Sequence, residues 1–278
     1  MNKIRLDAEK TPLSHVIIIT LFAVGATALP LDKLFCLFIS DSLTCALLSK
    51  TVLRVILSVV AVFFVFKYGY QGIFKGKCKF VGVLAIIPAL LVAINNAPII
   101  GLITGSVTVT ASKLNIALYV SYCLSIGIFE EVVFRGLVLP LCLKITEKRK
   151  KSAFWGVALS SAIFGISHLI GLFGGGSVGA VFLQVGYSFL IGAMCAIAIL
   201  ITKNIFSAIA LHFIYDLGGL MVGNIARGNQ WDLTTIIITA VLGVIVLVFM
   251  LFMLLKYNYQ EIKPLYYQTI AQQEEIKD

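Results

Sequence analysis

Charged side chains are scarce in this chain of 278 residues: Asp, Glu, Lys and Arg make up only 13% of it, whereas 60% of the residues are hydrophobic. A soluble domain has about a quarter charged residues. A chain that is this apolar over this length cannot hide its hydrophobic surface in one soluble core, so soluble enzymes and soluble binding modules are excluded. The mean hydropathy of +1.02 predicts a single membrane domain, residues 1–278, with the lipid bilayer as its solvent.

The patterns of several other protein classes are also missing. No two of the six cysteines form a CxxC pair, which argues against a zinc ribbon and against a thioredoxin-like site. No HExxH sequence of a zinc peptidase is present. The formal net charge of +9 is not accompanied by the aromatic and basic pattern of a nucleic-acid-binding surface. No nucleic-acid partner is therefore expected.

The six cysteines fall into two groups. Cys123, Cys142 and Cys195 lie in or at the edge of apolar runs and are interpreted as small packing residues. Cys36 and Cys45 could share an external loop, which leaves a disulfide open as an alternative to two free thiols.

Long apolar runs dominate what is present. A helix needs about 20 apolar residues to cross a bilayer, and eight runs approach this length: 13–30, 51–69, 80–98, 114–143, 153–171, 177–202, 204–222 and 233–255. The fourth run is too long for one simple span, so a tilted helix or a break near Glu130 is expected. The stretch 33–49 holds Lys33 and Asp41 and is interpreted as an interfacial or re-entrant segment. The fold class is thus predicted as all-α, a polytopic membrane bundle of about eight transmembrane helices.

The positions of Lys and Arg predict the orientation of this bundle. With the N-terminus in the cytoplasm and eight spans, the opposite side receives only Lys33, Lys50, Lys113 and Arg227. The remaining basic residues outside the spans then face the cytoplasm, as the positive-inside rule requires. Both termini are predicted to be cytoplasmic, with 257–278 as a polar cytoplasmic tail and the cell membrane as the location. The sequence Ala26-Thr27-Ala28 resembles a signal-peptide cleavage site, but the charge alternation favours an uncleaved first span.

An ionisable side chain inside a span costs several kcal/mol unless it is paired or hydrated, and is a functional candidate by default. The fourth run contains Glu130, Glu131 and Arg135. Glu131 and Arg135 are four residues apart, so they meet on one helix face and can form an ion pair. Glu130 lies about 100° round the helix and has no such partner. Glu131 is therefore predicted to be structural, and Glu130 to act as a general base.

Two further runs place histidines at membrane depth. His168 ends the segment from Phe164, in which Gly165 permits close helix packing. His212 and Asp216 are four residues apart and share a helix face, so the carboxylate could orient the imidazole. Each feature alone is as well explained by a structural hydrogen bond.

Together these groups can form one buried pocket within residues 113–222. The pocket would offer a base, proton carriers and oxyanion donors, but no acyl-enzyme nucleophile, because Ser167 has no base at helical spacing. Attack by an activated water is therefore favoured. A zinc ion held by Glu130, His168 and His212 remains an equal alternative to a metal-free reaction.

Three motifs in this order resemble the CAAX-protease and bacteriocin-processing (Abi) family: EExxxR at Glu130–Arg135, FxxxH at Phe164–His168 and HxxxN/D at His212–Asp216. The resemblance covers about residues 114–222. It implies an eight-helix intramembrane bundle with a conical cavity open towards the cytoplasm, and an endopeptidase activity. The eukaryotic member, the Ras-converting endopeptidase, removes the last three residues of prenylated CAAX proteins.

The resemblance also implies a role for each residue. Glu130 with His168 would activate the water, Glu131 would pair with Arg135, and the oxyanion site would be formed by His212 and Asp216. The eukaryotic member has Asn where this chain has Asp216. An amide donates hydrogen bonds to an oxyanion, whereas an ionised carboxylate repels it. Asp216 is therefore expected to be protonated, to orient His212 or to help hold a metal.

Three functions remain open from the sequence. The favoured one is an intramembrane endopeptidase that acts on a membrane-associated protein or peptide. The second is a bacteriocin self-immunity or scaffold protein of the same family. The third is a proton-coupled transporter, since intramembrane carboxylates and histidines also relay protons. The absence of a repeated half, together with the clustering of polar residues in the second half of the chain, argues against transport.

Overall fold

The computed structural model describes residues 13–76, 82, 84, 86–257 and 259–266. Its helices are, in chain order, α1 (Leu13–Thr27), α2 (Leu31–Phe35), α3 (Ser42–Tyr68), η2 (Gln71–Phe74), α5 (Ile87–Asn95), α6 (Ile99–Thr104), α7 (Lys113–Val133), η3 (Phe134–Val138), α8 (Leu139–Ile145), α9 (Ser152–Ser167), η4 (His168–Leu172), α10 (Val178–Thr202), α11 (Ile205–Gly219), α12 (Met221–Asn224), α13 (Leu233–Lys256) and α14 (Tyr259–Tyr266). Two three-residue strands, β1 (Val107–Val109) and β2 (Ala226–Gly228), pair antiparallel. The predicted helical class is thus correct, apart from this short ribbon.

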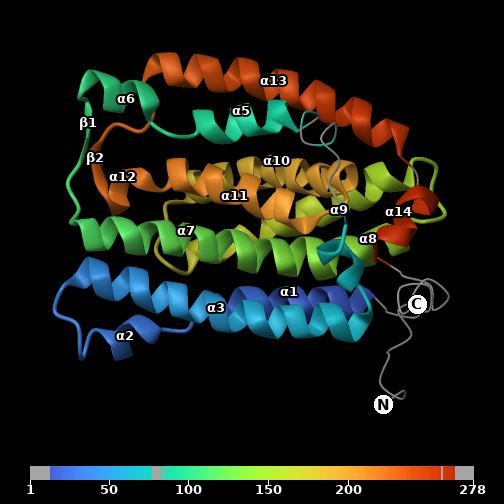
Figure 1. Cartoon of the computed structure of the whole chain (residues 1–278), viewed down its shortest axis with the longest axis horizontal. Coiled ribbons are helices and arrows are strands. Elements are labelled where there is room, and N and C mark those ends of the chain that lie inside the picture. The colour runs from blue at the N-terminus through green and yellow to red at the C-terminus, as the bar shows by residue number, and fades with distance from the viewer. Residues whose placement is uncertain (1–12, 77–81, 83, 85, 258, 267–278) are drawn as a thin grey trace.

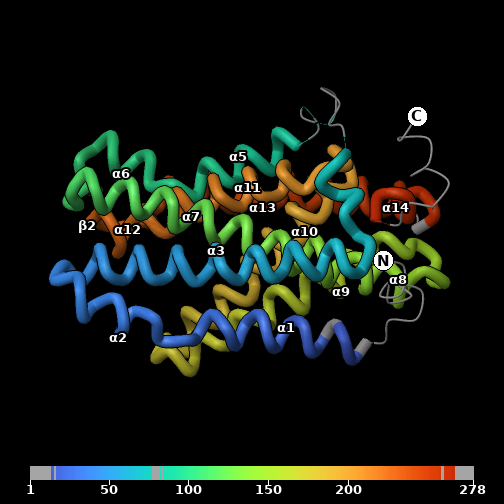
Figure 2. The backbone as a smooth tube through the Cα atoms, turned by 60° about the horizontal axis from the view of Figure 1, so that its bottom comes forward, coloured from blue at the N-terminus to red at the C-terminus, as the bar shows by residue number. Residues whose placement is uncertain are grey.

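The long helices lie alongside one another in one bundle (Figure 1). α5 and α13 run along one side, α1 and α3 along the opposite side, and α7, α10 and α11 lie between them. Turning the molecule shows that α1 lies beside α3 on the outside of the bundle (Figure 2). The outward faces carry large exposed hydrophobic side chains such as Phe63, Leu183 and Val244. Apolar surface on this scale is incompatible with water and suits lipid.

Each of the eight predicted runs contains a helix, but five are long and apolar enough to cross a membrane within the described residues: Ile17–Phe35, Ser42–Tyr68, Ser152–Leu172, Val178–Thr202 and Leu233–Lys256. The other three runs differ for physical reasons. α5 has nine described residues, and part of its run lies outside the described residues. α7 carries two carboxylates, and α11 has 15 residues. The chain is a membrane protein, and the number of eight spans stays a prediction.

The interpretation of 33–49 as an interfacial or re-entrant segment is wrong in its second half. Ser42–Ser49 forms the first two turns of α3, which continues without interruption to Tyr68. Asp41 caps this helix by accepting hydrogen bonds from the Thr44 amide at 2.8 Å and from the Asn115 side chain at 3.1 Å. The Thr44 hydroxyl and amide, together with Asn115, lower the pKa of Asp41. The carboxylate of Asp41 therefore caps the start of α3 and links this helix to α7 through Asn115.

Cys36 and Cys45 form a disulfide with a Cα–Cα distance of 5.5 Å. This bond joins the turn after α2 to the first turn of α3. The alternative of two free thiols is therefore wrong. Cys123, Cys142 and Cys195 are free and buried.

The fourth run is continuous but irregular. α7 passes through one π-helical turn, η3, and continues as α8. The irregularity begins at Phe134, four residues after Glu130, and ends at Val138. Pro140 follows, and it has no N–H to bond the carbonyl of Gly136, which is one reason for a locally wider turn. Gly136 itself packs closely on α3, since a Cβ there would lie 2.9 Å from Val65 Cγ2.

The two ends of the bundle differ in charge. The start of α1, the loop between α8 and α9, and α14 lie at one end, whereas α2, α6 and the β1–β2 pair lie at the other (Figure 1). The first end carries the basic cluster Lys148–Lys151, and the second carries Arg227 and the disulfide. The residues 1–12 and 267–278 lie outside the described residues, so the cytoplasmic location of both termini stays a prediction.

We expect the two ends to lie on opposite sides of the membrane. Single cysteines introduced at Lys148 and at Ser177, in a background without other reactive thiols, should be labelled from opposite sides of sealed vesicles. The physical reason is that α9 and η4 carry the chain from one end of the bundle to the other between these positions. Labelling of both positions by an impermeant thiol reagent from the same side would contradict this topology.

Candidate active site

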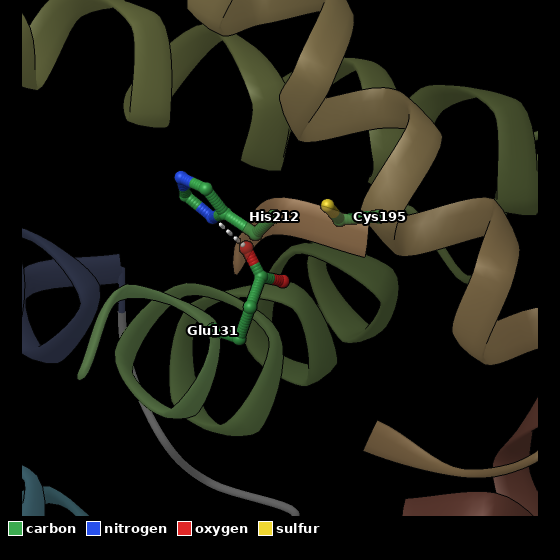
Figure 3. A group of neighbouring side chains, drawn as sticks. All are labelled: Glu131, Cys195 and His212. Carbon is green, nitrogen blue, oxygen red and sulfur yellow. Dashed lines mark hydrogen bonds and ion pairs between the residues drawn. The ribbon is translucent and has the colours of Figure 1, made fainter. Parts of the chain in front are cut away.

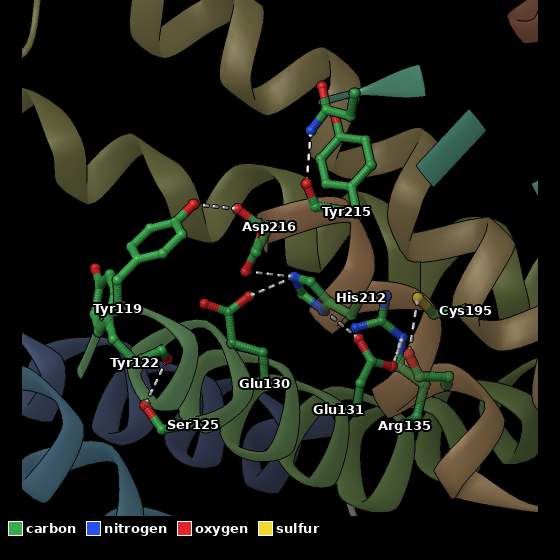
Figure 4. Close-up of polar contacts among 12 residues, drawn as sticks. Tyr119, Tyr122, Ser125, Glu130, Glu131, Arg135, Cys195, His212, Tyr215 and Asp216 are labelled. Carbon is green, nitrogen blue, oxygen red and sulfur yellow. Dashed lines mark hydrogen bonds and ion pairs between the residues drawn. The ribbon is translucent and has the colours of Figure 1, made fainter. Parts of the chain in front are cut away.

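Close packing of α7 against α11 positions the polar cluster. At Gly127 on α7, a Cβ would lie 3.2 Å from the Ile209 carbonyl oxygen and 3.3 Å from the Phe213 nitrogen. The two backbones approach this closely because glycine has no side chain. One turn further along, Glu131 on α7 faces His212 on α11, with 2.6 Å between Glu131 Oε1 and His212 Nδ1 (Figure 4).

Glu131 is also engaged by Arg135. Its second oxygen, Oε2, lies 3.1 Å from Arg135 Nε, and both side chains are buried, at 0% and 1% exposure. The contact is an ion pair without the alignment of a good hydrogen bond, and the two terminal nitrogens of Arg135 have no hydrogen-bond partner among the described residues. Arg135 instead stacks over the ring of Phe164 at 4.6 Å. The predicted pair of Glu131 and Arg135 is therefore present, but it is extended by a third group, His212.

Glu130 and Asp216 approach the other nitrogen of His212. His212 Nε2 lies 3.7 Å from Glu130 Oε2 and 3.5 Å from Asp216 Oδ2 (Figure 4). These distances are too long for direct hydrogen bonds. The side chains of Glu130 and Asp216 are 19% and 13% exposed, whereas that of Glu131 is fully buried. Glu130 is thus the carboxylate of the adjacent pair that a water or a substrate can reach.

A tyrosine holds the end of α11 that bears Asp216. The Tyr119 hydroxyl on α7 donates to the Leu217 carbonyl at 2.8 Å and is 3.2 Å from the carbonyl of Asp216. Tyr119 is fully buried. This contact fixes α7 against α11 on the side of the cluster opposite to Arg135.

His168 lies beside the cluster without joining its hydrogen-bond network. Its Nδ1 is 2.9 Å from the Phe164 carbonyl, and because a carbonyl only accepts, Nδ1 carries the proton and Nε2 is left as an acceptor. The ring of Phe164 packs edge to face against His168 at 4.9 Å and against His212 at 6.0 Å. The predicted close approach at Gly165 is confirmed, since a Cβ there would lie 2.7 Å from the Val185 carbonyl oxygen of α10.

Two functional neighbours were missed by the sequence analysis. Phe164 was noted only as part of a motif, yet its ring lies between Arg135 and the two histidines. Cys195 was interpreted as a packing residue, yet its thiol lies near Glu131 and His212 (Figure 3). In the sequence, Cys195 looks like Cys123 and Cys142, because all three lie in apolar runs. Its position beside Glu131 follows only from the packing of α10 against the other helices.

The residues that come closest to a metal-ligand set are not the predicted ones. Ligand atoms of Glu131, Cys195 and His212 lie within 4.8 Å of one another (Figure 3), whereas the predicted set of Glu130, His168 and His212 does not converge in this way among the described residues. The first set fits a cation poorly. Both oxygens of Glu131 are already engaged, one by His212 Nδ1 and one by the guanidinium of Arg135. A cation placed there would face the fixed positive charge of Arg135.

The arrangement combines an accessible carboxylate with an oriented imidazole. Glu131 accepts from Nδ1 of His212 and so directs Nε2 towards Glu130 and Asp216. Such a site can move a proton to or from a water that reaches Glu130, and it can stabilise charge at Nε2. The carboxylates Glu130 and Glu131 lie on α7, and His212 and Asp216 lie on α11. The ring of Phe164 on α9 lies between His212 and His168.

The segment that carries the three motifs is similar to a known protein family. The family model of the type II CAAX prenyl endopeptidase, Rce1-like, matches residues 112–218. No curated protein and no solved structure matches the chain. The matched segment starts at the cap of α7, ends in α11 and contains all three motifs. Through these residues the chain is similar to the Rce1-like family of type II CAAX prenyl endopeptidases, and the match supports the resemblance that the three motifs carry.

Proposed function

We propose that the chain is an intramembrane endopeptidase that hydrolyses a peptide bond of a membrane-associated protein or peptide, with Glu130 as the base that activates the water. The family match supports a CAAX-type protease embedded in a membrane. The observation that carries the residue assignment is the 3.7 Å gap between Glu130 Oε2 and His212 Nε2, beside a fully buried Glu131. The cell membrane is the proposed location.

The proposed reaction needs one proton carrier and one charge stabiliser. Glu130 takes a proton from the water, the hydroxide attacks the carbonyl carbon, and the proton passes to the leaving amine as the C–N bond breaks. When its ring carries both protons, His212 donates from Nε2 to the oxyanion, and Glu131 compensates the charge at Nδ1. His168 Nε2 is an additional acceptor next to the pocket.

Asp216 has a different role in this proposal from the Asn of the eukaryotic family member. Its Oδ2 faces His212 Nε2 at 3.5 Å, so it is suited to orient the imidazole and to compensate its charge. A carboxylate at this position does not serve as an oxyanion donor while it is ionised. The scaffold and transporter alternatives gain no support from the packing of the described residues, in which Glu130, Glu131 and Asp216 surround His212.

We expect Glu130→Gln to abolish hydrolysis while the protein still folds. Glutamine keeps the shape of the side chain but cannot accept the proton of the water. Peptides in membranes that contain wild type or Glu130→Gln are compared by mass spectrometry, and products should appear only with the wild type. Glu147→Gln, the same chemical change in the loop after α8, is the control and should behave like the wild type. Equal product formation by wild type and Glu130→Gln would show that Glu130 is not the base.

We expect Arg135→Ala to lower stability as well as activity. Removing one member of a buried ion pair leaves the other charge uncompensated and costs about 3–5 kcal/mol. Thermal unfolding in detergent should therefore show a clear loss of stability for Arg135→Ala and little change for Glu130→Gln. Arg149→Ala is the control, because Arg149 stacks on Trp155 outside the cluster and its loss should cost under about 1 kcal/mol. Similar destabilisation by Arg135→Ala and Glu130→Gln would contradict this division between support and chemistry.

We expect hydrolysis to be independent of a metal ion. Both oxygens of Glu131 are engaged by Arg135 and His212, so the set of Glu131, Cys195 and His212 offers a divalent ion no free carboxylate. Titration of the purified protein with a zinc chelator should leave the rate of peptide cleavage unchanged, and metal analysis should give less than one metal per chain. A stoichiometric metal whose removal stops cleavage, and whose return restores it, would refute the metal-free reaction.

A further inference from the structure

A polar cavity lies at the end of the bundle where α2, β1 and β2 lie (Figure 1). Its walls come from the starts of α3 and α7, the turn before α7, and the segment from Gly223 to Arg227. None of the motif residues lines it. Its volume of about 750 Å³ is within the range of about 300–1,000 Å³ that is usual for small-molecule sites. We call it the α3–α7–β2 cavity.

Backbone hydrogen bonds hold the walls of this cavity together. The carbonyl of Ile225 accepts from the amides of Thr110 and Ala111 at 3.0 and 3.2 Å, which joins the start of β2 to the turn before α7. Gly223 turns the chain from α12 towards β2 with a φ of +94°, and no heavy atom lies within 4 Å of the place where a Cβ would stand. The cavity is therefore a built feature of the fold.

Asp41 supplies a fixed negative charge to the cavity. The hydroxyl and amide of Thr44 and the side-chain amide of Asn115 all donate to Asp41 Oδ2. Oδ1 accepts no hydrogen bond among the described residues. The carboxylate is thus held in place through one oxygen, and the other is available to a ligand. A carboxylate only accepts hydrogen bonds, and it binds charged donors most strongly.

Arg227 supplies a positive charge to the same cavity. In the part of the chain that the structure describes, every ion pair involves Glu130, Glu131 or Asp216, so Arg227 is paired with no carboxylate. The N-terminus of α7, which Ser112 caps, opens onto the cavity as well. The first amides of a helix favour an anion. The cavity therefore suits a ligand that carries both an anion and a cation.

The cavity lies at the level of the lipid headgroups. α3 has 27 residues, so it is about 40 Å long, which matches a bilayer together with its headgroup regions. Asp41, at the start of α3, is then at the membrane surface. Leu114 lines the cavity and is 60% exposed, and the exposed side of α7 continues from it through Val120 and Leu124. An acyl chain can lie along this apolar surface.

We propose that the α3–α7–β2 cavity binds the headgroup of phosphatidylethanolamine, with the phosphate at Arg227 and the ammonium at Asp41. The ammonium donates three hydrogen bonds, whereas the trimethylated nitrogen of phosphatidylcholine donates none. Phosphatidylglycerol has no cation for Asp41. The exposed apolar side of α7 favours a lipid over a soluble molecule with the same two charged groups. This inference does not depend on the proposed protease activity.

Native mass spectrometry of the full chain in detergent tests this site. The protein is titrated with phosphatidylethanolamine, phosphatidylcholine or phosphatidylglycerol, each with two oleoyl chains. We expect phosphatidylethanolamine to bind at least about tenfold more tightly than either other lipid, since hydrogen bonds between charged groups are strong. Asp41→Asn should remove the preference over phosphatidylcholine, and α3 should stay intact because Asn also caps helices. Arg227→Gln should weaken the binding of all three lipids, and Arg227→Lys should retain part of it.

Two variants near the cavity are the matched controls. Asp32→Asn changes a carboxylate in the first turn of α2, and Lys113→Gln removes a cation at the first position of α7. Neither residue lines the cavity, so both variants should bind lipids like the wild type. Equal binding of the three lipids, tighter binding of phosphatidylglycerol, or a preference that persists in Asp41→Asn would overturn the proposal.

Competition with glycerophosphoethanolamine separates a lipid from a soluble ligand. This molecule has the same phosphate and ammonium but no acyl chains. Because its chains keep phosphatidylethanolamine in the same micelle as the protein, we expect displacement only at a concentration at least about a hundredfold above that of the lipid. Displacement at an equal concentration would overturn the assignment to a lipid.

Discussion

The buried carboxylate of Glu131 is the group on which the rest of the site depends. It is fully enclosed in an apolar bundle, where an uncompensated charge is not tolerated, and it is compensated from two directions. Arg135 approaches from its own helix and His212 from α11. The same contact therefore fixes the distance between two helices, the orientation of an imidazole and the position of an arginine. Glu130, one residue earlier on α7, lies 3.7 Å from Nε2 of the histidine that Glu131 holds.

Sequence reasoning identified the polar residues inside the spans, because each ionisable group stands out in an apolar run. It also identified the pair of Glu131 and Arg135, since a spacing of four residues on one helix determines their proximity. It could not identify His212 as a partner of Glu131, because helical spacing gives neighbours within one helix and not between helices. His212 and Asp216 share a face as expected, yet the short hydrogen bond of the histidine goes to α7. The same limit explains why Phe164 and Cys195 were missed as neighbours of the cluster.

Helix boundaries were harder to predict than helix content. Asp41 and Lys33 made the region before α3 look interfacial, because a charge inside an apolar stretch usually marks the membrane surface. The carboxylate instead satisfies amide groups at the start of α3, and this depends on Asn115, a residue 74 positions away. The disulfide at the same end of the bundle agrees with the predicted orientation, since disulfides form in oxidising compartments and the basic cluster Lys148–Lys151 lies at the opposite end.

The π-turn at Phe134–Val138 changes how the sequence after it should be aligned with the helix surface. A π-turn contains one residue more than an α-turn covers, so every position of α8 is rotated by about 100° from where an unbroken helix would place it. A helical wheel drawn from Lys113 through Ile145 therefore assigns residues of α8 to the wrong face of the helix. α7 and α8 are each regular α-helices when they are drawn separately. Beyond this turn, α8 packs against α9. If another sequence lacks one residue within this turn, the difference changes the helix geometry only locally. Glu130 and Glu131, which precede the turn, stay in register.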